Sequence, residues 1–219
     1  MAALAILLSA LIGALTALAA PALLRWLPAP EDEPELRFAD MGTRGFRLLL
    51  LGVCLATGSV LLLTTEPELW PVWAPLAGLG SLLGLVDART GFLPFRLNYL
   101  AFALVAAGVA ASCWLRGDWE PALLALAGSA GAAACYWLIW WISRGKLGFG
   151  DVRLAGLLGL AAGATSLTVL LWSFVLGSAI GGVWALAVRA SGRGREFPYG
   201  PSMLLGPVAA LLLAAVLPA

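Results

Sequence analysis

The sequence has no histidine, only three cysteines and few charged residues, and each shortage excludes a class of protein. Without histidine there is no Ser-His-Asp or Cys-His nucleophile and no His-ligated metal site. Charged residues make up 11% of the 219 residues, too few to cover a water-facing surface, since soluble domains carry about 25%. A net charge of +1 gives no basic excess for nucleic acid. Any catalysis must therefore use carboxylates, hydroxyls, lysine, tyrosine or cysteine.

The three cysteines are Cys54, Cys113 and Cys135, and all of them lie within apolar stretches. They show no Cys-x-x-Cys spacing, so they do not form a zinc motif. Buried structural cysteine is the default role for such residues. We therefore expect no metal and no cofactor.

What the sequence has in excess is hydrophobic residues, which make up 62% of it. A membrane-spanning helix needs about 20 mostly apolar residues. Eight stretches qualify as candidates, at 2–24, 45–64, 72–86, 98–115, 121–142, 148–163, 166–188 and 201–217. We predict an all-α polytopic membrane protein with about eight transmembrane helices, forming a single integral membrane domain over 1–219.

The cations in the connecting loops predict the orientation, because cytoplasmic loops carry an excess of lysine and arginine. Numbering the connections alternately places twelve of the thirteen cations on one side and only Arg116 on the other. The twelve are Arg25, Arg37, Arg44, Arg47, Arg89, Arg96, Arg144, Lys146, Arg153, Arg189, Arg193 and Arg195. We therefore predict that this side faces the cytoplasm and that both termini are extracytoplasmic.

The longest connection, 25–44, lies on the predicted cytoplasmic side and contains an acidic run. The run comprises Glu31, Asp32, Glu33 and Glu35. It fits a solvated, partly disordered linker. It also fits a site of attraction for a basic peptide, which salt would weaken because exposed charges are screened.

Two carboxylates stand apart from the loop acids, because Asp87 and Asp151 each lie at the cytoplasmic end of a hydrophobic stretch. Ionisable groups at membrane depth are expensive and are functional candidates by default. Asp151 follows Gly148 and Gly150, and we expect these glycines to leave it on a partly unwound, water-accessible segment. Asp87 is followed by a turn-rich exit that ends at Pro94.

Two carboxyl groups in one low-dielectric cleft cannot both ionise easily, so one keeps its proton. The ionised group can activate water while the protonated group polarises a carbonyl, which is the arrangement of aspartic proteases. Two alternatives remain open for Asp87 and Asp151. They could be neutral or paired with Arg89 or Arg153, or they could serve an ion- or proton-coupled transporter or a membrane assembly factor.

Three segments resemble motifs of the type IV prepilin peptidases. The stretch 145–154 (GKLGFGDVRL) resembles the family's G-x-G-D signature, and 86–94 resembles its first-aspartate segment, which runs to a Leu/Ile-Pro pair. The stretch 197–201 (FPYGP), followed by LLG at 204–206, resembles the Pro-Phe-Gly-Pro start of the last helix. Besides the two acids, the motif residues are Gly148, Gly150, Lys146, Arg153, Pro94, Pro198, Gly200 and Pro201.

The resemblance implies an aspartic endopeptidase of the cell (inner, cytoplasmic) membrane with its active site facing the cytoplasm. Asp87 and Asp151 would be its catalytic pair, and 45–219 would form the peptidase core. It would cut the short basic leader from pilin-like precursors, typically after a glycine. The hydrophobic N-terminal helix of the precursor would lie in the bilayer.

The sequence departs from the family pattern in three places. Many members carry two cysteine pairs that bind zinc in the loop after the first helix, and also N-methylate the new N-terminus. The loop 25–44 has no cysteine, so the resemblance is to a short form without zinc, and methyl transfer is left open. Phe95 follows the Leu-Pro pair where Asn or Asp is usual, and Gly145 and Lys146 stand where many members have an acid.

Overall fold

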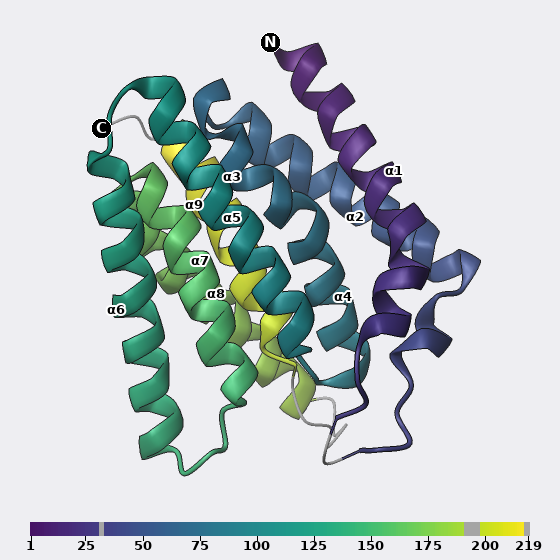
Figure 1. Ribbon diagram of the computed structural model, residues 1–219. Coiled ribbons are helices and arrows are strands. Elements are labelled where there is room, and N and C mark those ends of the chain that lie inside the picture. Colours follow the sequence, from purple (N-terminus) through teal and green to yellow (C-terminus); the bar gives the residue numbers. More distant parts are fainter. Residues whose placement is uncertain (31–32, 191–197, 217–219) are drawn as a thin grey trace.

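The computed structural model describes residues 1–30, 33–190 and 198–216, and these residues form helices and connections without any strand (Figure 1). The prediction of an all-α fold is confirmed. The long helices are α1 (Ala2–Trp26), α2 (Arg44–Leu63), α5 (Phe95–Arg116), α6 (Glu120–Ile142), α7 (Phe149–Thr165), α8 (Leu167–Ala190) and α9 (Gly200–Val216). The shorter elements are η1 (Phe38–Met41), η2 (Pro67–Leu69), α3 (Trp70–Pro75), η3 (Leu76–Gly80) and α4 (Ser81–Thr90).

Each of the eight predicted spans falls on helical structure. Within the described residues, six helical stretches are long and apolar enough to cross a membrane, and α9 is a shorter apolar helix; α7, which falls on the predicted span 148–163, has 17 residues and is not among the six. The third span, predicted over 72–86, is longer than expected, because η2, α3, η3 and α4 run on as one stretch, Pro67–Thr90. The orientation of the two ends of the chain stays a prediction.

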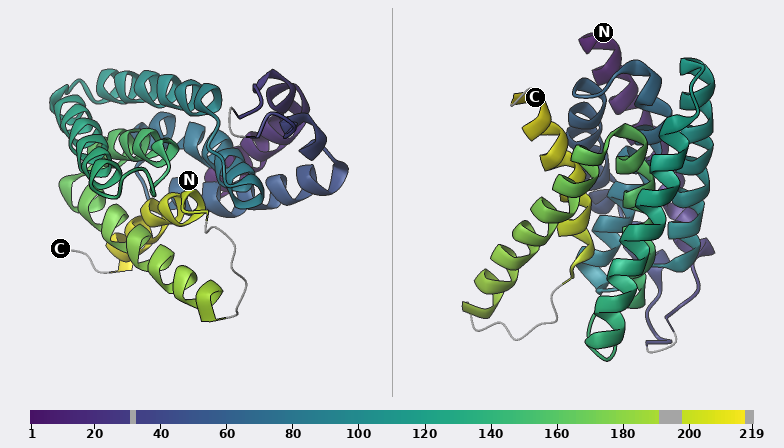
Figure 2. Two further views of the ribbon diagram at one scale, coloured as in Figure 1. Left: turned by 90° about the horizontal axis from the view of Figure 1, so that it is seen from below. Right: turned by 90° about the vertical axis from the view of Figure 1, so that its left-hand side faces the viewer.

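The helix α7 forms the centre of the bundle, where α5, α6, α8 and α9 all pack against it (Figure 2). Every residue from Leu154 to Ala164 is buried. By contrast, α1, α6 and α8 leave many large apolar side chains exposed, as helices that face lipid do. The short helix α7 therefore packs against protein on all sides from Leu154 onward.

Glycine allows α6 and α7 to approach to backbone contact. A Cβ atom placed on Gly159 would lie 2.4 Å from the carbonyl oxygen of Gly128, closer than any real Cβ contact. Small residues at such crossings let membrane helices pack tightly without a hydrophobic driving force. This contact fixes the height of α7, and with it the position of the 148–151 motif at its start.

Candidate active site

The first predicted acid, Asp87, lies in the last turn of α4 and is only 3% exposed. The helix ends at Gly91, whose φ of 72° lies in the left-handed region that favours glycine. The Gly91 N–H donates to the Asp87 carbonyl oxygen over 2.7 Å and closes the last turn. The turn-rich exit to Pro94 is thus confirmed, and it leaves Asp87 on rigid helix rather than on a loop.

The start of α9 faces the Asp87 carboxyl group. The backbone N–H of Gly200, the first residue of α9, donates to Asp87 Oδ2 over 2.9 Å. A Cβ atom on Gly200 would lie 2.7 Å from the same oxygen, so only glycine fits here. Pro201 follows in the first turn of α9, where a backbone N–H would have no acceptor within the helix, so proline is tolerated there. The Gly-Pro pair of the 197–201 motif therefore anchors the first acid.

The second predicted acid, Asp151, lies in the first turn of α7 and is 8% exposed. Its N–H donates to the carbonyl oxygen of Gly148, the N-cap residue, over 3.1 Å. The expectation of a partly unwound, water-accessible segment is wrong at this point, because α7 begins at Phe149, two residues before the acid. The burial of α7 on all sides supports a regular helical turn despite the two glycines.

The two acid motifs touch each other through Gly150 and Leu93. A Cβ atom on Gly150 would lie 2.8 Å from the Leu93 Cβ, so the glycine lets the start of α7 pack against the exit of α4. Three helix ends meet here, because α4 ends where α7 and α9 begin, at the lower side of Figure 1. The Asp87 and Asp151 side chains are close enough to interact electrostatically.

Neither acid forms an ion pair within the part of the chain that the structure describes, where Arg116–Glu66 is the only such pair. The Arg89 guanidinium lies over the Phe46 ring at 4.8 Å instead. Arg153 lies over the Phe149 ring at 4.9 Å, which places it beside the motif but not on a carboxylate. The alternative of an acid paired with Arg89 or Arg153 is therefore wrong.

The other predicted site residues lie around the two acids or in the loops. Pro94 is the N-cap of α5, Pro198 is half-buried just before α9, and Lys146 is exposed in the loop before α7. In the acidic run, Glu33 and Glu35 are exposed, and Glu31 and Asp32 lie outside the described residues. Across the described ranges, no group of three His, Cys, Asp or Glu side chains could hold a metal ion.

Sequence reasoning missed two tyrosines near the acids. The Tyr136 side chain, on α6, interacts electrostatically with Asp151, and Tyr199 directly precedes the Gly200 donor. A tyrosine within an otherwise apolar span is the signal that could have drawn attention to Tyr136. Tyr199 was visible in the motif, but its partners come from distant parts of the chain.

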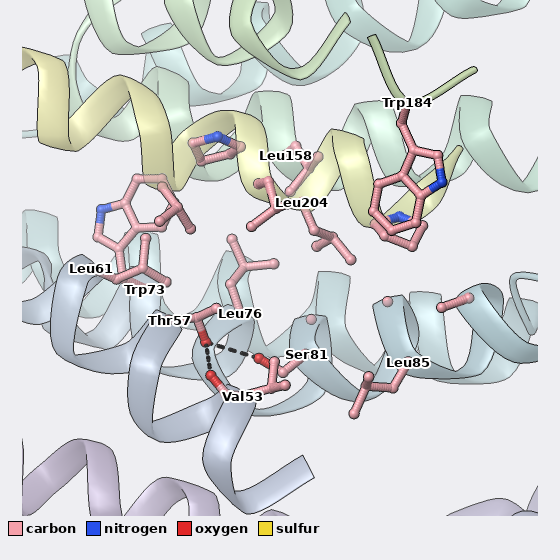
Figure 3. A pocket seen from close by; sticks show the side chains of 17 residues that line it. Val53, Thr57, Leu61, Trp73, Leu76, Ser81, Leu85, Leu158, Trp184 and Leu204 are labelled. Carbon is pink, nitrogen blue, oxygen red and sulfur yellow. Dashed lines mark hydrogen bonds between the residues drawn. The ribbon is translucent and has the colours of Figure 1, made fainter. Parts of the chain in front are cut away.

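An apolar cavity of about 340 Å³ lies near the Asp87–Gly200 contact, and its lining residues are drawn in Figure 3. Its walls come mainly from α2, η3, α4 and α9, with Trp184 of α8 at one edge. It reaches Ala88 and Pro201, the chain neighbours of Asp87 and Gly200. The Thr57 and Ser81 hydroxyls are its main polar groups, and they bond to each other at 3.0 Å. The cavity therefore ends next to the Asp87–Gly200 contact, although neither acid lines it.

The fold and the site define a polytopic helical protein with two buried, interacting acids at the meeting point of three helix ends. Residues 74–186, just over half of the chain, match the model of the type IV leader peptidase family, and the chain belongs to this family. The matched region contains Asp87 and Asp151. It ends before Gly200, whose contact with Asp87 is therefore seen only in the structure.

Two curated relatives are similar to this chain, and each is named "Prepilin leader peptidase/N-methyltransferase". The protein from Xanthomonas campestris pv. campestris is 29% identical over 126 residues, which cover 55% of this chain and 42% of that protein. The protein from Pseudomonas putida is 34% identical over 102 residues, which cover 44% of this chain and 35% of that protein. The chain thus matches less than half the length of either relative. No solved structure matches it.

Proposed function

We propose that this protein is an aspartic endopeptidase that removes the short basic leader from type IV pilin-like precursors at the cytoplasmic face of the inner membrane. The observation that carries the proposal is the pair Asp87 and Asp151, which are buried, form no ion pair with any cation of the described residues, and interact with each other. Membership of the type IV leader peptidase family supports the same reaction. The direct test is release of the leader from such a precursor by the purified protein.

The chemistry requires only the two carboxyl groups and water. The ionised carboxylate takes a proton from a water molecule as its oxygen attacks the scissile carbonyl carbon. The protonated carboxyl donates its proton to the carbonyl oxygen, which gives a neutral tetrahedral diol. When the C–N bond breaks, the leaving nitrogen takes a proton from the first acid, and the second recovers its proton from the diol. Both acids thus return to their starting states.

The apolar cavity supports a substrate whose hydrophobic segment follows directly after the cut. Its lining offers almost nothing to a basic leader, whereas an apolar side chain gains free energy by entering it. Because Ala88 and Pro201 adjoin the residues that form the Asp87–Gly200 contact, a chain leaving the acids meets the cavity at once. We therefore place the first residues of the precursor's hydrophobic helix along α4 and α9.

Photo-crosslinking tests this placement. A photoreactive phenylalanine analogue at Leu205, which lines the cavity and is 39% exposed, should form an adduct with a bound precursor in an Asp87→Asn background. The control position is Leu138 on α6, which is 46% exposed, lies about one turn from the same end of the bundle and does not line the cavity. Equal adducts from both positions, or adducts from Leu138 alone, would contradict the placement.

The acidic run would act before binding, by attracting the leader. Replacing Glu31, Asp32, Glu33 and Glu35 with their amides should raise KM about threefold at low salt and leave it unchanged near 0.5 M salt, where exposed charges are screened within a few ångströms. The matched control neutralises the four acids of the opposite loops, Glu66, Glu68, Asp118 and Glu120. An effect of equal size at both salt concentrations would rule out electrostatic attraction and leave the run as a linker.

A further inference from the structure

Tyr136 is an exception on its helix. Of the 23 residues of α6, the described buried ones are Ala125, Gly128 and Tyr136, and the first two serve the close packing of α6 on α7. The Tyr136 ring is 7% exposed and packs against Phe174 of α8, with ring centroids 5.7 Å apart. It also packs against the Tyr199 ring at 6.4 Å. A large polar side chain is thus buried where α6, α8 and the start of α9 meet.

Three hydroxyl groups from three different segments gather at this junction. The Tyr199 hydroxyl donates to Ser178 Oγ on α8 over 3.1 Å. The Tyr136 hydroxyl on α6 interacts with the side chains of both Tyr199 and Ser178. Since hydroxyl groups in an apolar setting gain by bonding to one another, the cluster fastens these three segments together.

Tyr199 is half-buried, and several contacts hold it in place. A Cβ atom on Gly181 of α8 would lie 2.6 Å from the Tyr199 ring, so this glycine leaves the space that the ring occupies. The Ser202 hydroxyl donates to the Tyr199 carbonyl oxygen over 2.7 Å. The next residue, Gly200, donates its N–H to Asp87. Because the ring and this donor belong to adjacent residues, we expect a displaced Tyr199 ring to disturb the donor that holds the first acid.

The same cluster reaches the second acid, because the Tyr136 hydroxyl interacts electrostatically with Asp151. One tyrosine thus adjoins the donor to Asp87 and the other lies near Asp151. The 197–201 segment resembles a family motif that has phenylalanine at position 199, so the hydroxyl bond to Ser178 is a feature of this chain.

We infer that Tyr136 and Tyr199 are positioning residues, which set the geometry of the acid pair by holding Gly200 against Asp87. This inference rests on the proposed peptidase function. The two rings contribute more to this positioning than the hydroxyl groups do, because the rings hold the start of α9. The Tyr136 hydroxyl contributes through its electrostatic interaction with Asp151. Neither tyrosine contacts the scissile bond in this account.

The test compares ring removal with hydroxyl removal. Tyr199→Ala should lower kcat for precursor cleavage at least about tenfold with KM within about twofold, because misplaced catalytic groups slow chemistry more than binding. Tyr199→Phe keeps the ring beside Gly181 and should stay within about threefold of the wild type. Tyr136→Phe should lower kcat severalfold. The matched control is Tyr99→Phe, since Tyr99 is exposed on α5 and the substitution keeps the ring that packs against Phe95 and lies 5.9 Å from the Arg153 guanidinium.

A second readout does not depend on cleavage. The infrared band of protonated carboxyl groups, assigned to the pair by its loss in Asp151→Asn, should shift in Tyr136→Phe and stay unchanged in Tyr99→Phe. A role in packing alone would lower the melting temperature without moving this band. Because Tyr136→Phe removes only a hydroxyl, it keeps the test decisive if Tyr199→Ala fails to fold.

The outcomes separate the two proposals. A band shift in Tyr136→Phe without any cleavage by the wild type would support the positioning role and overturn the peptidase function. Normal cleavage by the wild type and by Tyr136→Phe, with an unmoved carboxyl band, would overturn the positioning role and leave the peptidase function standing. If Tyr199→Phe lowers kcat as much as Tyr199→Ala does, the claim that the Tyr199 ring, rather than its hydroxyl, positions the start of α9 is wrong.

Discussion

Asp87→Asn and Asp151→Asn should each lower the rate of leader release at least about 10³-fold, since acid–base catalysis by a positioned side chain contributes about 10²–10⁴-fold and both acids take part in every step. Asparagine has nearly the same shape as aspartate, but it can neither accept the proton of water nor donate one to the carbonyl oxygen. In Asp87→Asn the new amide oxygen could still accept the Gly200 N–H, so the fold should survive. The rate is measured by the mass of the released leader.

The matched control for the acid variants is Asp118→Asn, in the connection between α5 and α6. Asp118 accepts the Glu120 N–H over 2.9 Å and lies in an exposed turn at the other end of α5 from the acid pair. This variant should cleave at the wild-type rate. If Asp87→Asn and Asp151→Asn also cleave at that rate, the acid-pair mechanism is wrong.

Gly200→Ala should lower kcat about a hundredfold, because a misplacement of about 1 Å at a catalytic group can cost that much. The added methyl group would lie 2.7 Å from Asp87 Oδ2, so either the carboxylate or the start of α9 must move. The N–H bond that anchors the acid is then lengthened or lost. The measurement is kcat for precursor cleavage together with the melting temperature.

Gly182→Ala on the neighbouring helix α8 is the matched control for Gly200→Ala. Nothing lies within 4 Å of a Cβ atom placed on Gly182, and alanine is favoured over glycine inside a helix. This variant should cleave like the wild type and be at least as stable. Equal rates for Gly200→Ala and Gly182→Ala would show that the contact between α9 and Asp87 does not matter for the reaction.

The helices could be predicted from apolar runs, and the limits of this method are visible in the third span. The predicted span covers 72–86, between Pro71 and Asp87, yet the helical stretch continues from Pro67 to Thr90. Proline is tolerated near a helix start, and here η2 and α3 begin at or just before one. Asp87 is tolerated because Gly200 supplies a donor. Both reasons depend on local and tertiary geometry that a hydropathy window does not see.

The two acids could be singled out from the sequence because charge at the end of an apolar run is costly. The Gly200 donor could not, since a backbone N–H gives no side-chain signal and its partner lies 113 residues away. The central position of α7 in the bundle could not be predicted either. Charge patterns indicate how deep a residue lies in the membrane, but they do not indicate which helix the other helices surround. The role of Tyr136 depends on α8 and α9 together, so only the assembled bundle could suggest it.

Leader release in proteoliposomes tests the central claim most directly. Purified protein and a pilin-like precursor are reconstituted together, and mass spectrometry follows the free leader while a pH-sensitive dye follows proton flux across the same vesicles. The account predicts that the wild type releases the leader, that neither Asp→Asn variant does, and that flux is the same in all three. An uncut precursor with a proton flux that depends on Asp151 would contradict the account and favour a transporter.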